Sequence, residues 1–303
     1  ENKIIVNSCP RFQGESENII EEFMICANEA AATLAKKAKL PFLYRVHENP
    51  PTRKVEALKE VCQSIGINTA NLGEKISATD LSTLFKQSKG TPKEKIINEQ
   101  VLRTMAKAKY DHRNIGHFGL VLDNYSHFTS PIRRYPDTII HRILSEYVAG
   151  VDKGKIVKRY EKYVPQAGTY LSACELRAMT IERQCEDCYK AEYMRGEIGN
   201  VFDGIVSSVA PHGVYVELPN TIEGMVHMSK LPGGTFEFDG KVSAVDSNNG
   251  KRYTVGDEVR IRVVSVDVSA GKIDFELASY YKKLNYLNSS AFLFISFQKL
   301  NQF

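Results

Sequence analysis

The chain of 303 residues has no uninterrupted run of 18 apolar residues, the length that a membrane-spanning helix needs. Its opening does not resemble a secretory signal, and it begins at Glu1 without a methionine, so we expect a fragment or a processed end. The cysteines are too scattered for a disulfide framework: Cys9, Cys26, Cys62, Cys174, Cys185 and Cys188. Because free thiols persist in a reducing compartment, we expect a cytoplasmic protein with no membrane partner.

Several classes of active site are also missing from the sequence. It has no glycine-rich phosphate loop of the Walker type, and no serine or cysteine nucleophile with a plausible base stands out. Cys185 and Cys188 form a single pair on an expected helix, without a second pair at zinc-binding spacing. These absences argue against a P-loop nucleotide hydrolase, a covalent hydrolase and a zinc protein.

The composition and the charge pattern are those of a globular chain with two unlike parts. Hydrophobic residues make up 43% and charged residues 25%, and the length suggests two domains. Residues 1–197 hold 30 Lys and Arg against 25 Asp and Glu, whereas residues 198–278 hold 7 against 11. The basic first part is compatible with an anionic partner, and the acidic second part argues against nucleic-acid binding by charge alone.

Helical periodicity dominates residues 1–197. Ser16 is placed to cap a helix whose apolar residues recur at steps of three and four, namely Ile19, Ile20, Phe23, Ala27, Ala30 and Leu34. The same signals predict helices after Thr52, after Thr91-Pro92 and from Pro165 to about Met194. The helix after Thr52 should place Val55, Leu58, Cys62 and Ile65 on one face, and the next helix should do the same with Ile97, Val101 and Met105. A short strand is expected at 4–6.

Residues 198–278 change to the period-two alternation of strands. Strands are predicted at 201–209, 214–218, 224–227, 258–267 and 273–277, with a loop-rich insert between the third and the fourth. Five strands in this length indicate a small closed barrel of the OB type. The fold class is therefore α+β, a mostly helical part followed by a five-stranded barrel, and residues 279–303 form a tail without an assigned role.

The segment from Ser130 to Asp137 has an unusual arrangement of charge. Ser130 is a good helix cap and Pro131 a good first helical residue, so we expect a helix to begin there. Arg133 and Arg134 then lie in the first turn, where the helix dipole disfavours cations. A bound phosphate would resolve this conflict. The alternative is that both arginines pair with nearby carboxylates, and the sequence leaves the two readings open.

This segment belongs to a longer pattern, His117-Phe118-Gly119-Leu120, then Thr129-Ser130-Pro131-Ile132-Arg133-Arg134-Tyr135-Pro136-Asp137 and His141-Arg142. The pattern resembles the RNB catalytic domain of the RNase II and RNase R family of 3′-to-5′ exoribonucleases. Three further stretches resemble the same family: 14–30, 40–48 and 190–194. The resemblance implies that Arg133 is catalytic and stabilises negative charge at the scissile phosphate. It also makes Arg134 and Arg142 candidate RNA-binding residues.

The second part resembles an S1 RNA-binding domain, an OB barrel. The resemblance rests on Gly204-x-Val206, His212 to Val216, Glu223 to His227, and the stretch from Tyr253 to Leu277. S1 domains stack bases on exposed rings and hold the backbone with a few polar groups. The candidate RNA-binding residues that this implies are His212, Tyr215, His227, Asp267 and Lys272. Because Val214 and Val216 should point into the barrel, we expect Tyr215 to point outward.

The cation ligands of the family are missing from the sequence. The resemblance implies Mg²⁺ held by a run of closely spaced aspartates, whereas the aspartates before residue 198 stand at least ten residues apart: Asp80, Asp111, Asp123, Asp137, Asp152 and Asp187. We expect residues 1–197 to be the C-terminal part of an RNB domain and 198–278 to be an S1 domain.

These parts imply a parent enzyme that degrades single-stranded or structured RNA, and not DNA, processively to nucleoside 5′-monophosphates with Mg²⁺, while the chain alone is inactive. One alternative is a non-catalytic protein that binds single-stranded RNA. Another is a fragment that completes an active site with a second chain.

Overall fold

The computed structural model describes residues 5, 7–9, 12–70, 72–73, 75–91 and 93–279. The helices are α1 (Glu15–Ala38), α2 (Thr52–Ser64), α3 (Ala78–Ser88), α4 (Glu94–Thr104), α5 (Tyr135–Val148), α6 (Lys153–Tyr160) and α7 (Tyr163–Arg195), with 3-10 helices at Phe118–Leu120 and Met228–Lys230. The strands are β1 (Tyr44–Val46), β2 (Lys109–Asp111), β3 (Val201–Ala210), β4 (Gly213–Glu217), β5 (Glu223–His227), β6 (Phe236–Phe238), β7 (Ser243–Asp246), β8 (Arg252–Thr254), β9 (Glu258–Asp267) and β10 (Lys272–Ser279).

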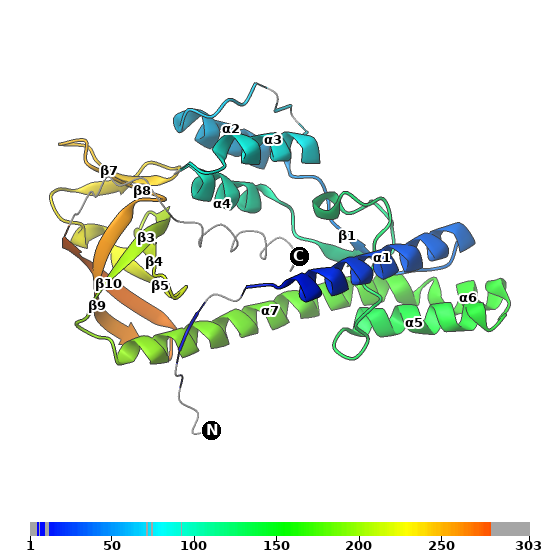
Figure 1. Cartoon of the computed structure of the whole chain (residues 1–303). Coiled ribbons are helices and arrows are strands. Elements are labelled where there is room, and N and C mark those ends of the chain that lie inside the picture. The colour runs from blue at the N-terminus through cyan, green and yellow to red at the C-terminus, as the bar shows by residue number, and fades with distance from the viewer. Residues whose placement is uncertain are drawn as a thin grey trace.

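The long helix α7 connects the two parts of the molecule (Figure 1). Its first half packs beside α5, α6 and the two-stranded sheet of β1 and β2, and its C-terminal end reaches the barrel, where Ala191 and Met194 are fully buried. Gly168 lets α7 approach β2 closely, because an added Cβ would lie 3.1 Å from the Tyr110 carbonyl oxygen. The predicted helix from Pro165 to Met194 is confirmed, with its start two residues earlier. No helix among the described residues is long and apolar enough to cross a membrane.

Helix α1 begins at Glu15, one residue before the predicted cap Ser16, because the Glu17 carboxylate accepts a hydrogen bond from the Gly14 N–H at 2.7 Å. The apolar residues that recur along α1 do not form its buried face. The exposed apolar residues of α1 are Ile19, Ile20, Phe23, Met24 and Leu34. The buried ones are Asn28, Ala31, Ala32 and Ala35, which face a core shared with α5, α6 and α7. The predicted stripe is therefore solvent-facing in this chain.

Helices α2, α3 and α4 pack around a core of their own, and Val61 of α2 and Ile96 of α4 also join the core of the barrel. The predictions for α2 and α4 are confirmed within one and two residues at their starts. Of the residues predicted to share a face, Val55, Leu58, Cys62, Ile97, Val101 and Met105 are buried and Ile65 is partly buried. Gly66 follows α2 with a positive φ of 70°, which explains why the helix stops there. The structure adds α3, which the sequence analysis did not predict.

The predicted helix start at Ser130 is wrong. Helix α5 begins at Tyr135, and Arg134 precedes it as the cap residue with extended backbone angles. A second proline explains the difference. Pro136 has no N–H and would interrupt a helix that began at Pro131, but it fits the first turn of a helix that begins one residue before it. Arg133 and Arg134 therefore lie in the turn that leads into α5, and not in its first helical turn.

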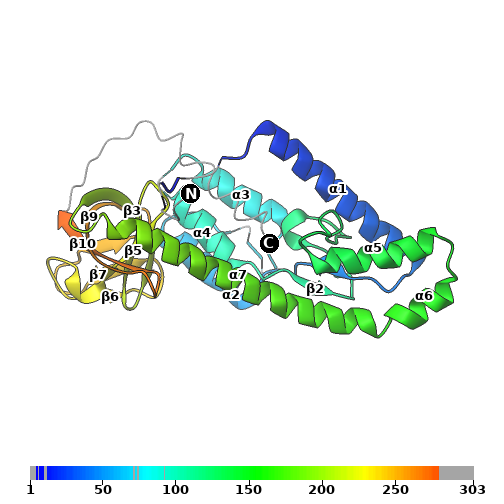
Figure 2. The same ribbon diagram turned by 90° about the horizontal axis from the view of Figure 1, so that it is seen from below.

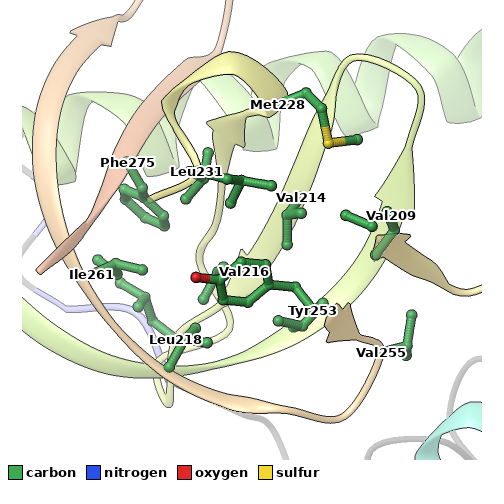
Figure 3. Packing of buried hydrophobic residues seen from close by; sticks show 14 of the residues in the cluster. Val209, Val214, Val216, Leu218, Met228, Leu231, Tyr253, Val255, Ile261 and Phe275 are labelled. Atoms are coloured by element: carbon green, nitrogen blue, oxygen red, sulfur yellow. The ribbon is translucent and has the colours of Figure 1, made fainter. Parts of the chain in front are cut away.

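The second part is a closed five-stranded barrel with strand order β10-β5-β4-β3-β9, which confirms the predicted fold class. Val214, Val216 and Phe275 point into its interior in Figure 3 and are almost fully buried. Gly224 is required here, because an added Cβ would lie 2.5 Å from the ring of Phe275. The insert between β5 and β9 is not merely loop-rich. It forms a three-stranded sheet of β6, β7 and β8 that buries Phe236, Ala244 and Tyr253. Residues 4 and 6 of the predicted strand at 4–6 lie outside the described residues, and Ile5 between them is not assigned to a strand. All but the first residue of the tail 279–303 also lie outside the described residues.

Candidate functional site

The turn before α5 is held by a buried carboxylate. Asp137 is completely buried, and its Oδ2 accepts hydrogen bonds from the Ser130 N–H at 2.8 Å and from Arg134 Nε and Nη2 at 3.2 and 2.8 Å. A carboxylate that pairs with a guanidinium and a backbone donor at once fixes the positions of both. The conformation of residues 130–134 is therefore determined by one side chain from the first turn of α5.

Arg133 and Arg134 have different surroundings. Arg134 is paired with Asp137, as the second reading of the sequence expected. The Arg133 side chain is exposed and makes no hydrogen bond or ion pair with any described residue. Ile132 beside it is fully exposed as well. The turn thus presents one free guanidinium to solvent on a backbone that its neighbour keeps in place. Whether Arg134 also contacts RNA stays a prediction.

Asn28 fixes the segment that leads into this turn. From the buried face of α1, its Oδ1 accepts hydrogen bonds from the backbone N–H groups of Phe128 at 2.8 Å and Thr129 at 3.2 Å, and its Nδ2 donates to the Tyr125 hydroxyl at 3.0 Å. The sequence analysis missed this role. The available signal was an asparagine among the alanines of α1, since a buried amide needs partners.

His117, which is buried, and His127, which is half-buried, both have lowered pKa values. Burial, with smaller contributions from His47 and Arg45, lowers the pKa of His117 to about 3. Burial, followed by the charges of Arg134 and Arg45, holds the pKa of His127 well below its ordinary value. The His127 Nδ1 lies 2.8 Å from the Tyr110 hydroxyl. The lowered pKa values favour the uncharged form of both rings at neutral pH.

Arg142 lies on the exposed side of α5. Its guanidinium carbon is 5.9 Å from the centre of the Tyr135 ring. Hydrogen bonds with Tyr163 and with Arg142 lower the pKa of the Tyr135 hydroxyl. Arg142 thus has aromatic and hydroxyl partners, in contrast to Arg133, and its contact with RNA stays a prediction.

The outer face of β4 and β5 brings three of the predicted barrel residues together. The register pairs Tyr215 with Met225 and Gly213 with His227, so these side chains share one face of the barrel. His212 Nε2 lies 2.7 Å from the Tyr215 hydroxyl, and the two rings meet edge to face at 5.8 Å. Val214 and Val216 are buried while Tyr215 is partly exposed, as the alternation predicted. We call His212, Tyr215, Met225 and His227 the ring face.

Asp267 and Lys272 lie at the hairpin between β9 and β10, where the register pairs them. The Asp267 carboxylate accepts hydrogen bonds from the Ser269 hydroxyl at 2.7 Å and the Ala270 N–H at 3.0 Å, and these bonds lower its pKa. Asp267 therefore shapes the turn. Strand β10 runs beside β5, with Asp274 paired with Met225, so Lys272, two residues before Asp274, points to the same side as the ring face.

The described residues do not fit the Mg²⁺ that the family resemblance implies. No group of three or more His, Cys, Asp or Glu side chains that could hold a metal ion occurs among them. Hard cations such as Mg²⁺ need several oxygen ligands in close to octahedral arrangement. Folding therefore does not bring the scattered aspartates of this part of the chain together into a cation site.

Both the helical part and the barrel match known protein families. Residues 1–150 match the RNB domain family, and residues 195–278 match the S1 RNA binding domain family. The chain is 38% identical to ribonuclease R 1 of Lactococcus lactis over 284 residues, and 39% identical to ribonuclease R of Aquifex aeolicus over 273 residues. These matches cover 91% and 88% of the chain but only 35% and 38% of the relatives' own lengths.

Solved structures show the same fold. The chain resembles Mycoplasma genitalium RNase R in complex with ribose methylated single-stranded RNA, with a TM-score of 0.81 and 24% identity. It resembles the complex of that enzyme with double-stranded RNA with a TM-score of 0.72. Each comparison covers 88% of this chain and 42% of the solved chain. The helical part and the barrel thus occur in these structures in a similar arrangement.

Proposed function

Because the chain belongs to the RNB family and matches RNase R across an RNB segment and an S1 domain, we propose that it acts in 3′-to-5′ exonucleolytic degradation of RNA to nucleoside 5′-monophosphates. Residues 1–197 form the C-terminal part of the RNB domain in this proposal, and 198–278 form the S1 domain. The chain spans only 35% and 38% of the lengths of the two ribonuclease R relatives, and the proposed activity is that of an enzyme of their full length.

The observation that carries the proposal is the free guanidinium of Arg133. A catalytic cation must meet the charge that develops on the phosphate without reorganising, and a side chain already paired with an acid cannot do so. Arg133 has no such partner among the described residues, and the turn that bears it is fixed by Asp137 and Asn28. We assign Arg133 to the scissile phosphate and Arg134 chiefly to holding the turn.

The ring face of the S1 barrel is the proposed contact for single-stranded RNA. Tyr215 and His212 offer partly exposed rings for base stacking, and His227 and Lys272 offer polar groups to the backbone. The hydrogen bond between His212 and Tyr215 holds the two rings at a fixed angle, which reduces the entropy lost on binding.

We place the Mg²⁺ ligands of the complete enzyme outside the described residues, since those residues do not fit the ion. The isolated chain should therefore bind RNA without hydrolysing it. Because binding without hydrolysis is expected, a second function is that of a non-catalytic RNA-binding protein. The specific observation in favour of the second function is the combination of an intact ring face with the lack of a cation site in the described part.

The test uses the purified chain and a labelled oligouridylate. We expect the chain to bind the RNA and not to favour DNA of the same sequence over it. We expect no release of nucleoside monophosphate when Mg²⁺ is added. Addition of a separately produced N-terminal part of an RNase R should restore release that EDTA abolishes. Failure of the chain to bind RNA would overturn both functions. Binding without restored release would favour the non-catalytic protein, and strong EDTA-sensitive release by the chain alone would contradict the expected inactivity.

A further inference from the structure

Lysines gather at the end of the helical part that lies farthest from the barrel. Three occur at the C-terminal end of α1, and four lysines and an arginine occur on α6 and the turn after it. These residues are Lys36, Lys37, Lys39, Lys153, Lys155, Lys158, Arg159 and Lys162, and all are exposed. We call this set the distal basic surface.

The two groups of lysines lie at one place in the fold. Ala35 and Leu40, which flank the α1 lysines, share a buried cluster with Ile156 and Tyr160 of α6. Figures 1 and 2 agree that the end of α1 and helix α6 meet at the same end of the molecule, with the barrel at the opposite end. Residues far apart in the sequence thus contribute to one positively charged surface.

The charge of this surface is not balanced locally. Residues 35–40 and 149–163 together hold eight lysines and arginines against two acids, whereas the whole chain has a net charge of only +4. Arg159 pairs with Glu146, and Asp152 caps α6. The seven lysines make no hydrogen bond or ion pair through their side chains with any described residue. Most of the net positive charge of the chain is therefore concentrated here.

Helix stabilisation explains only part of this charge. Lys36 and Lys37 lie in the last turn of α1, where cations interact favourably with the helix dipole. Lys153 and Lys155 lie in the first turn of α6, where the dipole disfavours them, and they add to the repulsion from the other lysines. An arrangement that costs stability in the free protein indicates an anionic partner.

We propose that the distal basic surface binds the phosphodiester backbone of RNA, at a site separate from Arg133 and from the ring face. Helix α5 lies between the surface and Arg133, and its 14 residues span about 21 Å. Lysines are flexible point charges that suit phosphates, and they do not read bases in a fixed geometry. The site therefore holds RNA without sequence preference and with strong salt dependence. This inference depends on the proposed function, in which RNA is the ligand.

The test compares two variants that each lose four positive charges. The surface variant carries Lys36→Gln, Lys37→Gln, Lys155→Gln and Lys158→Gln, and the control carries Lys75→Gln, Lys86→Gln, Lys89→Gln and Lys107→Gln, all at exposed positions. Affinity for labelled oligouridylate is measured from low to high salt. Since each lost phosphate contact lowers the slope of log affinity against log salt by about 0.7, we expect the surface variant to lose up to about 3 from the slope and the control to lose much less.

Equal behaviour of the two variants would overturn the distal site. If the unmodified chain binds no RNA, the proposed function fails together with the site. If Tyr215→Ala weakens RNA binding while the surface variant does not, only the distal site fails. Binding to vesicles that contain phosphatidylserine is measured as well. If the surface variant loses vesicle binding but keeps its RNA binding, the surface binds a membrane and the proposal is contradicted.

Discussion

Asp137 receives both the Nε and the Nη2 of Arg134 on a single buried oxygen, at 3.2 and 2.8 Å. The same oxygen also accepts the Ser130 N–H. Arg134 therefore stabilises the turn through its pair with Asp137. The side chain of Arg133 makes no hydrogen bond or ion pair with a described residue. Two adjacent cations therefore have different surroundings, one paired with a buried carboxylate and one exposed to solvent.

Removal of the carboxylate at Asp137 should destabilise the fold. Asp137→Ala leaves a guanidinium and a backbone N–H without their acceptor, and breaking a buried charged pair costs about 3–5 kcal/mol. We expect a lower free energy of unfolding in urea. Asp123→Ala, at an exposed position, is the matched control and should change stability by less than about 0.5 kcal/mol. Equal stability of the two variants would mean that Asp137 does not hold the turn.

Arg133→Ala, unlike Asp137→Ala, should leave the stability of the fold unchanged and should reduce catalysis. The side chain has no described partner, so the unfolding free energy should stay within about 0.5 kcal/mol of the unmodified chain. In the enzyme completed with an N-terminal part, kcat should fall far more than the affinity for RNA, because the contact strengthens as charge develops. Single-turnover kinetics with binding measured separately would check this. A large loss of affinity with unchanged kcat would reassign Arg133 to positioning of RNA.

The barrel and the long helix α7 could be predicted from local patterns, and the turn at Arg133 could not. Alternating apolar residues fix which side of a strand is buried, so the outward direction of Tyr215 followed from Val214 and Val216. The predicted helix start at Ser130 and Pro131 was wrong because it did not take into account Pro136, which is equally suitable near a helix start. The structure selects Pro136, and Asp137 then bonds back to Ser130.

Long-range contacts account for the other differences between the predicted and the observed structure. Periodicity identifies the apolar stripe of α1, with Ile19 and Phe23, but it does not say what covers that stripe, and in this chain both residues are exposed. The bond from Asn28 to the Phe128 backbone joins positions 100 residues apart, which no local signal specifies. The family motifs drew attention to Arg133 and Arg134, whereas the pairing of Arg134 with Asp137 could be seen only in the fold.

Tyr215→Ala should weaken RNA binding by about 1–3 kcal/mol if the ring stacks on a base. Tyr215→Phe is the informative control, because it keeps the ring and removes only the hydroxyl that lies 2.7 Å from His212 Nε2. We expect the phenylalanine variant to retain most of the affinity. Circular dichroism should show that both variants fold. Unfolding of the alanine variant, or equal loss of affinity in both variants, would contradict stacking as the role of this ring.

The buried histidines should make the fold sensitive to acid. The pKa of His117 is lowered to about 3 in the folded chain, and that of His127 is also well below its ordinary value. In the unfolded chain both rings take up protons below about pH 6.5, so the unfolded state binds more protons there. The free energy of unfolding should therefore fall as the pH drops below about 6.5, by up to about 1.4 kcal/mol per pH unit for each histidine.

Urea denaturation between neutral and mildly acidic pH would measure this dependence. His117→Gln should flatten it, because a group that is neutral in both states no longer couples folding to protons. An unchanged pH dependence in the His117→Gln variant would show that His117 is not held neutral by burial, and the packing around this ring would then need another explanation.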